Sequence, residues 1–208
     1  ELTGPSLSRL RPKLRETAIV LWGLYLLLTV IELLCLKFIG GMSFFDSVNH
    51  ALTTMPSGGF STRDASIGFY NSATIDMIII VFMFLAGVNF TLIWLAGSGN
   101  IKQAFKDEEF RTYLWYIGFA VAIITTTLLI ANYAAGESLR YTLFTVLSIG
   151  TSTGYSSTDY GSWPVLARLV LLILMIVGAC AGSTSGGLKL MRIRLALKIA
   201  FRELSRIA

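Results

Sequence analysis

The sequence is poor in charged residues, cysteine and histidine, and each shortage argues against a class of protein. Charged side chains make up only 14% of the 208 residues, whereas a soluble domain carries about a quarter, so a globule surrounded by water is disfavoured. The two cysteines, Cys35 and Cys180, lie in apolar stretches. They are interpreted as small buried hydrophobic residues and not as a disulfide or metal framework. Hydrophobic residues reach 54% and the mean hydropathy is +0.70, which also excludes disorder. These features together indicate a membrane protein.

Long apolar stretches predict how the chain crosses the bilayer. A spanning helix needs about 20 mainly apolar residues. The stretches that meet or approach this length are 18–38, 74–95, 113–133 and 165–181. Two shorter apolar stretches, 43–55 and 139–150, lie between these spans and suit re-entrant helices that enter the membrane and return. We therefore expect an all-α membrane protein.

The distribution of Lys and Arg predicts the orientation. Thirteen of the 17 basic residues lie in segments 9–15, 102–111 and 189–206, and four lie on the other side of the expected spans. The positive-inside rule then places both ends of the chain and the middle loop in the cytoplasm. The basic end of the chain is interpreted as a helix on the cytoplasmic membrane face, so no nucleic-acid partner is expected.

An internal repeat appears when the sequence is shifted by 95 residues. Segment 57–61 (SGGFS) then falls on 152–156 (STGYS), Thr53 on Ser148 and Asp64 on Asp159, without a gap. Chance alignment of apolar residues would explain the hydrophobic matches, but not this shared glycine-aromatic-serine turn. The two halves have the same orientation and form parallel repeats. The expected units are a linker 1–16, a first repeat 17–99, a loop 100–111, a second repeat 112–188 and a basic segment 189–208.

The polar turn that follows each short helix predicts a binding site for a monovalent cation. Backbone carbonyls without partners are costly in hydrocarbon, but carbonyls directed at a common axis can replace the hydration shell of an ion. Glycine permits the required dihedrals, and the short helix turns the negative end of its dipole toward the ion. Tight turns in extracellular loops are the alternative. The candidate ligands are Ser57, Gly58, Gly59, Ser152, Thr153 and Gly154.

Segment 178–187 interrupts the last expected span with glycines and hydroxyl residues, which form helices poorly. Two other interpretations exist. Gly178, Gly182 and Gly186 are spaced as in closely packed helices. Gly182 and Gly187 have the spacing of a phosphate-binding loop, but Leu188 stands where that motif requires lysine, which disfavours phosphate binding.

Two strings carry a resemblance to a known family. Segments 58–69 (GGFSTRDASIGF) and 178–189 (GACAGSTSGGLK) resemble the Trk/Ktr/HKT superfamily of potassium transporters, most closely its bacterial Trk-type pore subunits. The resemblance covers essentially the whole chain. Members have four repeats around one pore, and this chain matches the second and third.

The resemblance implies a location, a gate and a set of partners. The location is the bacterial inner membrane, with potassium as the transported ion and without an organic cofactor. The partners are the lipid bilayer, the remaining repeats, a second copy in a homodimer and a cytoplasmic nucleotide-binding regulatory ring. The implied gate is a loop within the membrane, formed by Gly178, Gly182, Ser183, Thr184, Ser185, Gly186 and Gly187.

The predicted function is potassium uptake through a carbonyl-lined filter. A sodium-permeable or sodium- or proton-coupled transporter and a non-conducting scaffold subunit are the alternatives. An intramembrane enzyme is disfavoured, because the chain has one histidine and lacks a paired catalytic set at pore depth. Asp76, Arg168, Glu32 and Lys37 are expected at the outer membrane interface, and His50 is expected to be packed or hydrogen-bonded and not a ligand.

Overall fold

The computed structural model describes residues 7–207, and all regular structure within them is helical. In the first half, a short 3-10 turn, Ser66–Tyr70, follows α2, and α1 continues into a π-helical turn, Cys35–Ile39. The second half has a similar 3-10 turn, Tyr160–Ser162. The α-helices are α1 (Leu7–Leu34), α2 (Phe44–Thr54), α3 (Ala73–Gly87), α4 (Phe90–Gly97), α5 (Ile101–Lys106), α6 (Glu108–Ile130), α7 (Ala135–Gly150), α8 (Val165–Val177) and α9 (Leu190–Ile207). The expected all-α class is confirmed.

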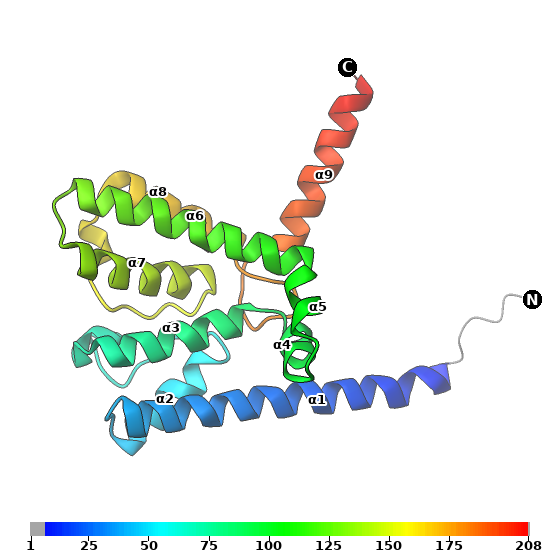
Figure 1. Cartoon of the computed structure of the whole chain (residues 1–208), viewed down its shortest axis with the longest axis horizontal. Helices are drawn as coiled ribbons and strands as arrows, with labels where there is room; N and C mark the ends of the chain where they lie inside the picture. The colour runs from blue at the N-terminus through cyan, green and yellow to red at the C-terminus, as the bar shows by residue number, and fades with distance from the viewer. Residues whose placement is uncertain (1–6, 208) are drawn as a thin grey trace, which may run out of the picture.

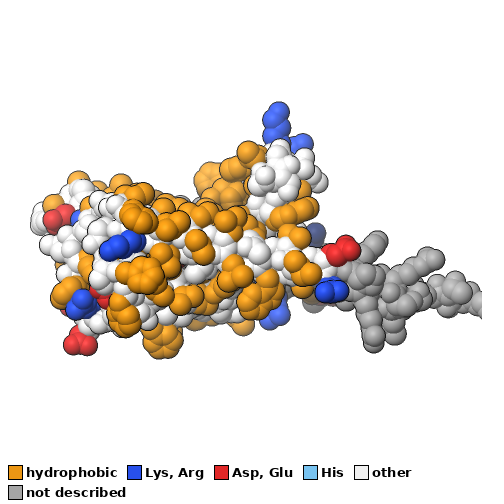
Figure 2. Space-filling model, turned by 90° about the horizontal axis from the view of Figure 1, so that it is seen from below, with side chains coloured by type: hydrophobic (Ala, Val, Ile, Leu, Met, Phe, Trp, Pro, Cys, Tyr) orange, Lys and Arg blue, Asp and Glu red, His pale blue; other side chains and the backbone are white. Residues whose placement is uncertain are grey.

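The longer helices run in roughly the same direction, and shorter elements lie across them at one end. Figure 1 shows α1, α3, α6 and α7 side by side, with α4, α5 and α9 set across them at one end. The helices α3, α6, α7 and α8 pack into one core with Ile79, Tyr113, Phe144 and Leu174 at its centre. Hydrophobic side chains also cover most of the face shown in Figure 2. Such an apolar exterior fits lipid as the surrounding medium.

The expected spans differ in their continuity. Arg15–Ile39 and Glu108–Ile130 are each long and apolar enough to cross a bilayer. Segment 86–89 (AGVN), which the shift of 95 residues aligns with 181–184, predicts a weak break in the second span. The structure shows a break at this position, and it is sharp, because α3 and α4 meet at 106°. Val88 is extended there, and the Asn89 side chain accepts a hydrogen bond from the Thr91 N–H at the start of α4. The fourth span is also interrupted, because α8 ends before Gly178, whose φ is +75°.

The flanking segments are more helical than a linker or loop requires. The expected linker 1–16 contains the start of α1, and its residues 1–6 lie outside the described part of the chain. Segment 100–111 contains α5 and the first turn of α6. The basic segment 189–208 is almost entirely α9, with residue 208 outside the description.

Two acidic residues expected at the membrane interface are buried. Asp76 retains 3% exposure, and its carboxylate lies 3.4 Å from Nε of Arg140 on α7. Glu32 is fully buried, and neither of its carboxyl oxygens has a hydrogen-bond partner within the described structure. Helix packing encloses both side chains, so neither extends to the protein surface as a snorkelling side chain does. Lys37 donates to the Met42 carbonyl at 3.3 Å.

The Asp76–Arg140 pair gives a test of how the two halves are held together. Arg140→Met should lower the free energy of unfolding by about 3 kcal/mol, because it leaves a buried carboxylate without its partner. Reversible unfolding in detergent measures this loss. The double variant Asp76→Asn, Arg140→Met should recover part of it, since no buried charge is then left alone. A double variant as unstable as Arg140→Met would contradict this account.

Candidate functional site

The polar turn after α2 has alternating backbone handedness. Ser57 and Gly59 have φ of +57° and +64°, and Gly58 between them does not have a positive φ. The N–H groups of Gly58 and Gly59 both donate to the carbonyl of Thr53, at 2.8 and 3.1 Å. The Thr53 hydroxyl donates to the carbonyl of Phe60 at 2.8 Å. Thr53 in the last turn of α2 therefore holds residues 58–60 through both its carbonyl and its hydroxyl group.

The turn after α7 repeats this pattern at an offset of 95 residues. Ser152 and Gly154 have φ of +60° and +86°. The Gly154 N–H donates to the Ser148 carbonyl at 3.0 Å, and the Ser148 hydroxyl donates to the Tyr155 carbonyl at 2.6 Å. Each bond matches one made by the first turn. The two segments are therefore built by the same local interactions.

The two turns lie in direct contact. A Cβ added at Gly59 would lie 1.8 Å from the Thr153 carbonyl oxygen, so only glycine allows the backbones to approach this closely. At Gly154 the same construction meets nothing within 4 Å. All six predicted ligand residues are thus brought together, but their hydroxyls are not equally available. The Thr153 hydroxyl is 2.8 Å from that of Thr151.

Tyr155 joins the second turn to the helix behind the first. Its ring is 2% exposed, and its hydroxyl lies 2.6 Å from the Thr53 hydroxyl and donates to the His50 carbonyl at 3.1 Å. Phe60 is at the equivalent position of the first half and is 76% exposed. The contact between the halves therefore uses Tyr155 on one side and leaves Phe60 on the other side uncovered.

Polar side chains support the first turn from behind. The His50 ring nitrogens lie 2.7 Å from the Asp46 carbonyl and 3.0 Å from the Ser61 hydroxyl, so His50 is hydrogen-bonded as expected. The Asp46 carboxylate accepts from the Thr62 hydroxyl at 2.6 Å and from the Arg63 guanidinium at 3.2 Å. The hydrogen bond from Thr62, with further ones from neighbouring groups, lowers the pKa of Asp46 to about 2. Asp46 therefore remains a carboxylate at neutral pH.

Segment 178–187 is a loop that packs against the break between α3 and α4. The Cys180 and Thr184 N–H groups donate to the carbonyls of Gly87 and Ala86, at 3.1 and 3.3 Å. In return, the Phe90 N–H at the start of α4 donates to the Gly182 carbonyl at 3.2 Å. The two interruptions therefore satisfy each other's backbone groups. Because 178–187 is not helical, packing of its glycines along a helix face is excluded.

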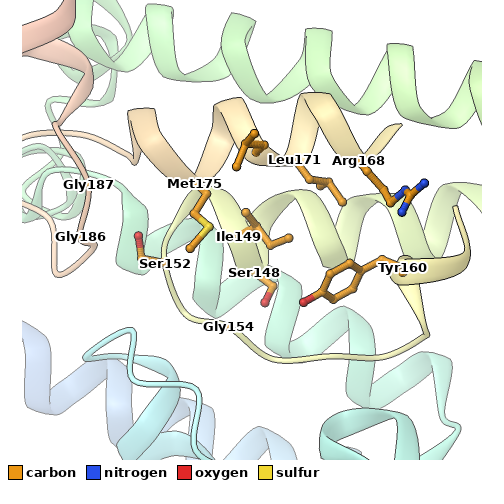
Figure 3. A pocket seen from close by; sticks show the side chains of 12 residues that line it. Ser148, Ile149, Ser152, Gly154, Tyr160, Arg168, Leu171, Met175, Gly186 and Gly187 are labelled. Atoms are coloured by element: carbon orange, nitrogen blue, oxygen red, sulfur yellow. The ribbon is translucent and has the colours of Figure 1, made fainter. Parts of the chain in front are cut away.

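The loop lies next to both polar turns. The Ser57 hydroxyl is 3.1 Å from the Thr184 hydroxyl, and a Cβ added at Gly186 would lie 3.3 Å from the Ser152 hydroxyl. A cleft of about 590 Å³ is lined by Ser152 and Gly154 from the turn and by Gly186 and Gly187 from the loop. Figure 3 shows these residues facing the same space.

The other loop residues are held by the loop itself and by Lys189. Ser183 donates to the Cys180 carbonyl at 2.6 Å, and its hydroxyl lies 2.8 Å from that of Ser185. The Lys189 ammonium donates to the Ser183 and Ser185 hydroxyls and to the Ser185 carbonyl. Gly178 and Gly187 pack together backbone to backbone. A Cβ on Gly187 would clash with Gly178, and a Cβ on Gly178 would clash with the Gly186 carbonyl oxygen. The loop is therefore a compact unit.

Sequence reasoning did not single out three residues that shape this region. Tyr155 appeared only as the aromatic residue of a motif, and its bridge to Thr53 depends on how the halves pack. Asn89 lies at a break that the sequence showed only weakly. Glu109 accepts a hydrogen bond from the Ala181 N–H at 2.6 Å, and nothing in its local sequence indicates a partner 72 positions away.

An all-helical chain with an apolar exterior and interrupted helices meeting around polar turns defines an integral membrane protein. The chain belongs to the TrkH family of cation transport proteins, whose family model matches residues 8–206. The resemblance deduced from segments 58–69 and 178–189 is confirmed.

The relatives of this chain are bacterial potassium uptake proteins. The Trk system potassium uptake protein TrkH of Salmonella typhimurium is 39% identical over the whole chain, which covers 44% of that protein. TrkG of Escherichia coli is 33% identical, with 43% of it covered. The crystal structure of the potassium transporter TrkH from Vibrio parahaemolyticus matches with a TM-score of 0.88 at 35% identity, over 94% of this chain and 43% of that one. The chain thus spans less than half the length of these relatives.

The unequal surroundings of the two glycines predict unequal effects of substitution. Gly59→Ala should strongly reduce the yield of folded protein, because its methyl group would overlap the Thr153 carbonyl oxygen. Gly154→Ala should be milder, with a strain of about 1–2 kcal/mol from its left-handed backbone. Gel filtration and thermal unfolding in detergent measure both. Equal damage by the two substitutions would contradict the close contact at Gly59.

Proposed function

We propose that this chain forms half of the wall of a potassium pore in the bacterial inner membrane. The observation that carries the proposal is the contact between the two turns, in which Gly59 lies against the Thr153 carbonyl. Alternating handedness at residues 57–59 and 152–154 lets successive carbonyls face one side. Carbonyls of Ser57, Gly58, Gly59, Ser152, Thr153 and Gly154 then replace the water around a monovalent ion.

The hydrogen bonds of the site favour main-chain oxygens as the ligands. The hydroxyls of Ser57 and Thr153 are within 3.1 and 2.8 Å of the hydroxyls of Thr184 and Thr151. The Thr53 and Ser148 carbonyls accept the glycine N–H groups of the turns. These contacts fix the segments while leaving the carbonyls of the turns themselves for the ion. Potassium uptake by the relatives TrkH and TrkG agrees with this chemistry.

The proposed gate is the loop formed by Gly178, Gly182, Ser183, Thr184, Ser185, Gly186 and Gly187. Its Thr184 and Gly186 lie next to Ser57 and Ser152, so the loop stands directly behind the proposed filter. Closure is maintained by hydrogen bonds to the end of α3. Opening requires these hydrogen bonds to be replaced by others or by bonds to water. This exchange keeps the free-energy difference between the closed and open loop small enough for regulation.

Transport itself requires no covalent chemistry. An inside-negative potential supplies roughly 2.3 kcal/mol per 100 mV to a monovalent cation, which drives uptake once the path is open. The proposal requires two further repeats to complete the filter, and it includes a homodimer and a cytoplasmic nucleotide-binding regulatory ring as partners. Both described ends of the chain are placed on the cytoplasmic side, where α9 presents its basic residues.

The filter assignment predicts the result of Gly154→Asp. The protein that contains this chain is expressed in a bacterial strain that lacks potassium uptake, and growth is followed at low potassium. The variant should insert normally but lose selective uptake, because a carboxylate at the ring of carbonyls replaces size-matched coordination by a fixed charge. Gly99→Asp is the control, because Gly99 has the same left-handed backbone (φ +89°), lies in an exposed turn between α4 and α5, and has no atom within 4 Å of an added Cβ. Unchanged growth with Gly154→Asp would overturn the filter assignment.

The gate assignment predicts that a shorter loop conducts more. Removing residues 183–185 deletes the Thr184 bonds to Ala86 and to Ser57. We expect basal rubidium flux into vesicles to rise severalfold. Selectivity over sodium should change little, because the carbonyls of both turns remain. A shortened protein with wild-type basal flux would count against the loop as the gate.

A further inference from the structure

Glu109 is a buried carboxylate that binds the loop from a different helix. It lies in the first turn of α6 and is 8% exposed. Its Oε1 accepts a hydrogen bond from the main-chain N–H of Ala181 at 2.6 Å. Hydrogen bonds with an ionised acceptor are stronger than neutral ones. This bond therefore contributes more to holding the loop than a typical backbone contact.

Glu109 lies at the start of a helix, close to the residue that caps it. The first turn of a helix carries partial positive charge, and Asp107 caps the same turn by accepting from the Phe110 N–H at 2.8 Å. Lys189 at the other end of the loop interacts electrostatically with Glu109. The carboxylate is therefore compensated by the helix end, by a lysine and by a backbone N–H. The N–H belongs to Ala181 in the loop, and the lysine is Lys189, which follows the loop.

The same helix end also contacts α9, which follows the loop. Glu108, the neighbour of Glu109, forms an ion pair with Arg194 of α9. The first residue of α9, Leu190, donates its N–H to the Ala179 carbonyl at 3.1 Å. An open cleft of about 590 Å³ separates the start of α6 from α9. Figure 1 shows this junction at the end where α4, α5 and α9 lie across the bundle.

We propose that Glu109 is a positioning residue that latches the loop in its closed arrangement, and that a shift of α6 relative to α9 releases it. The proposal rests on the gate role proposed above. A shift of the α6 end relative to α9 separates Glu109 from Ala181. The bonds from Cys180 and Thr184 to α3 are then the ones that must still exchange for the loop to open. Through Glu109, the contact between the start of α6 and α9 is thus connected directly to Ala181 in the loop.

The buried thiol of Cys180 provides a reporter of loop release. Cys180 is next to Ala181 and is fully buried, so a water-soluble maleimide should label it slowly in the closed arrangement. The test uses membrane vesicles of the protein that contains this chain, with every other cysteine replaced by serine. Labelling rate and basal rubidium flux are measured on the same preparations.

Glu109→Ala should increase the labelling rate of Cys180 about tenfold, which corresponds to loss of one hydrogen bond to a charged group. Basal flux should rise with it. Glu109→Gln retains an oxygen acceptor without the charge, so both measurements should lie between wild type and Glu109→Ala. Glu137→Ala is the matched control, because Glu137 is also in the first turn of a helix but is exposed, at the start of α7. Selectivity for potassium over sodium should be the same in all variants.

Ala167→Cys in place of Cys180 tests for general unfolding, because residue 167 is fully buried in α8 away from the loop. It should stay unlabelled when combined with Glu109→Ala. The latch is overturned if Cys180 labelling is unchanged in Glu109→Ala, if Glu109→Gln labels equally fast, or if the thiol at 167 becomes accessible as well. Faster labelling without increased flux would support the latch and refute the gate role.

Discussion

The structure depends on one constraint, which is that backbone N–H and C=O groups within a membrane need partners from the protein. The helices satisfy their own groups, and the interruptions cannot. Here the N–H groups of Cys180 and Thr184, in the loop after α8, donate to the Gly87 and Ala86 carbonyls at the α3–α4 break. In return, the Phe90 N–H at this break donates to the Gly182 carbonyl of the loop. Each break alone would leave polar groups unpaired at several kcal/mol each. Together they form a polar region inside an apolar bundle.

The same constraint explains why the turns have so little freedom. Glycine N–H groups of both turns return to the last turn of the preceding helix, and a hydroxyl at Thr53 or Ser148 holds the next carbonyl. The carbonyls of residues 57–59 and 152–154 accept none of these backbone hydrogen bonds. A cation that loses its water there gains those oxygens, so the proposed selectivity follows from where internal hydrogen bonding stops.

Much of this arrangement could be predicted from the sequence. Residues 57–59 and 152–154 were identified by their shared pattern, in which Gly59 and Gly154 recur at the same offset and have the left-handed dihedrals that glycine adopts readily. The class of fold followed from the apolar stretches. The sequence indicated a break at Val88–Asn89 only weakly, since neither residue breaks a helix by itself, and it did not predict a bend of 106°. Its stability comes from a loop nearly a hundred residues later.

Burial of charged residues was the least predictable feature. Asp76 and Glu32 lie near the ends of apolar stretches, where an interfacial position is the usual outcome. Their burial depends on Arg140 and on packing of α1 that no local pattern records. Glu109 is similar, because an acidic residue in the first turn of a helix is ordinarily explained by the helix dipole alone.

Tyr155 and Phe60 occupy equivalent places but have opposite environments, one enclosed by the neighbouring half and the other 76% exposed. The surface that the second half buries against the first is thus different from the surface that the first half leaves exposed. Contacts of this head-to-tail type do not close after two units, because a free donor face and a free acceptor face always remain. In such an assembly, each unit therefore has one neighbour that it encloses and another that encloses it, so the neighbours on its two sides are not interchangeable.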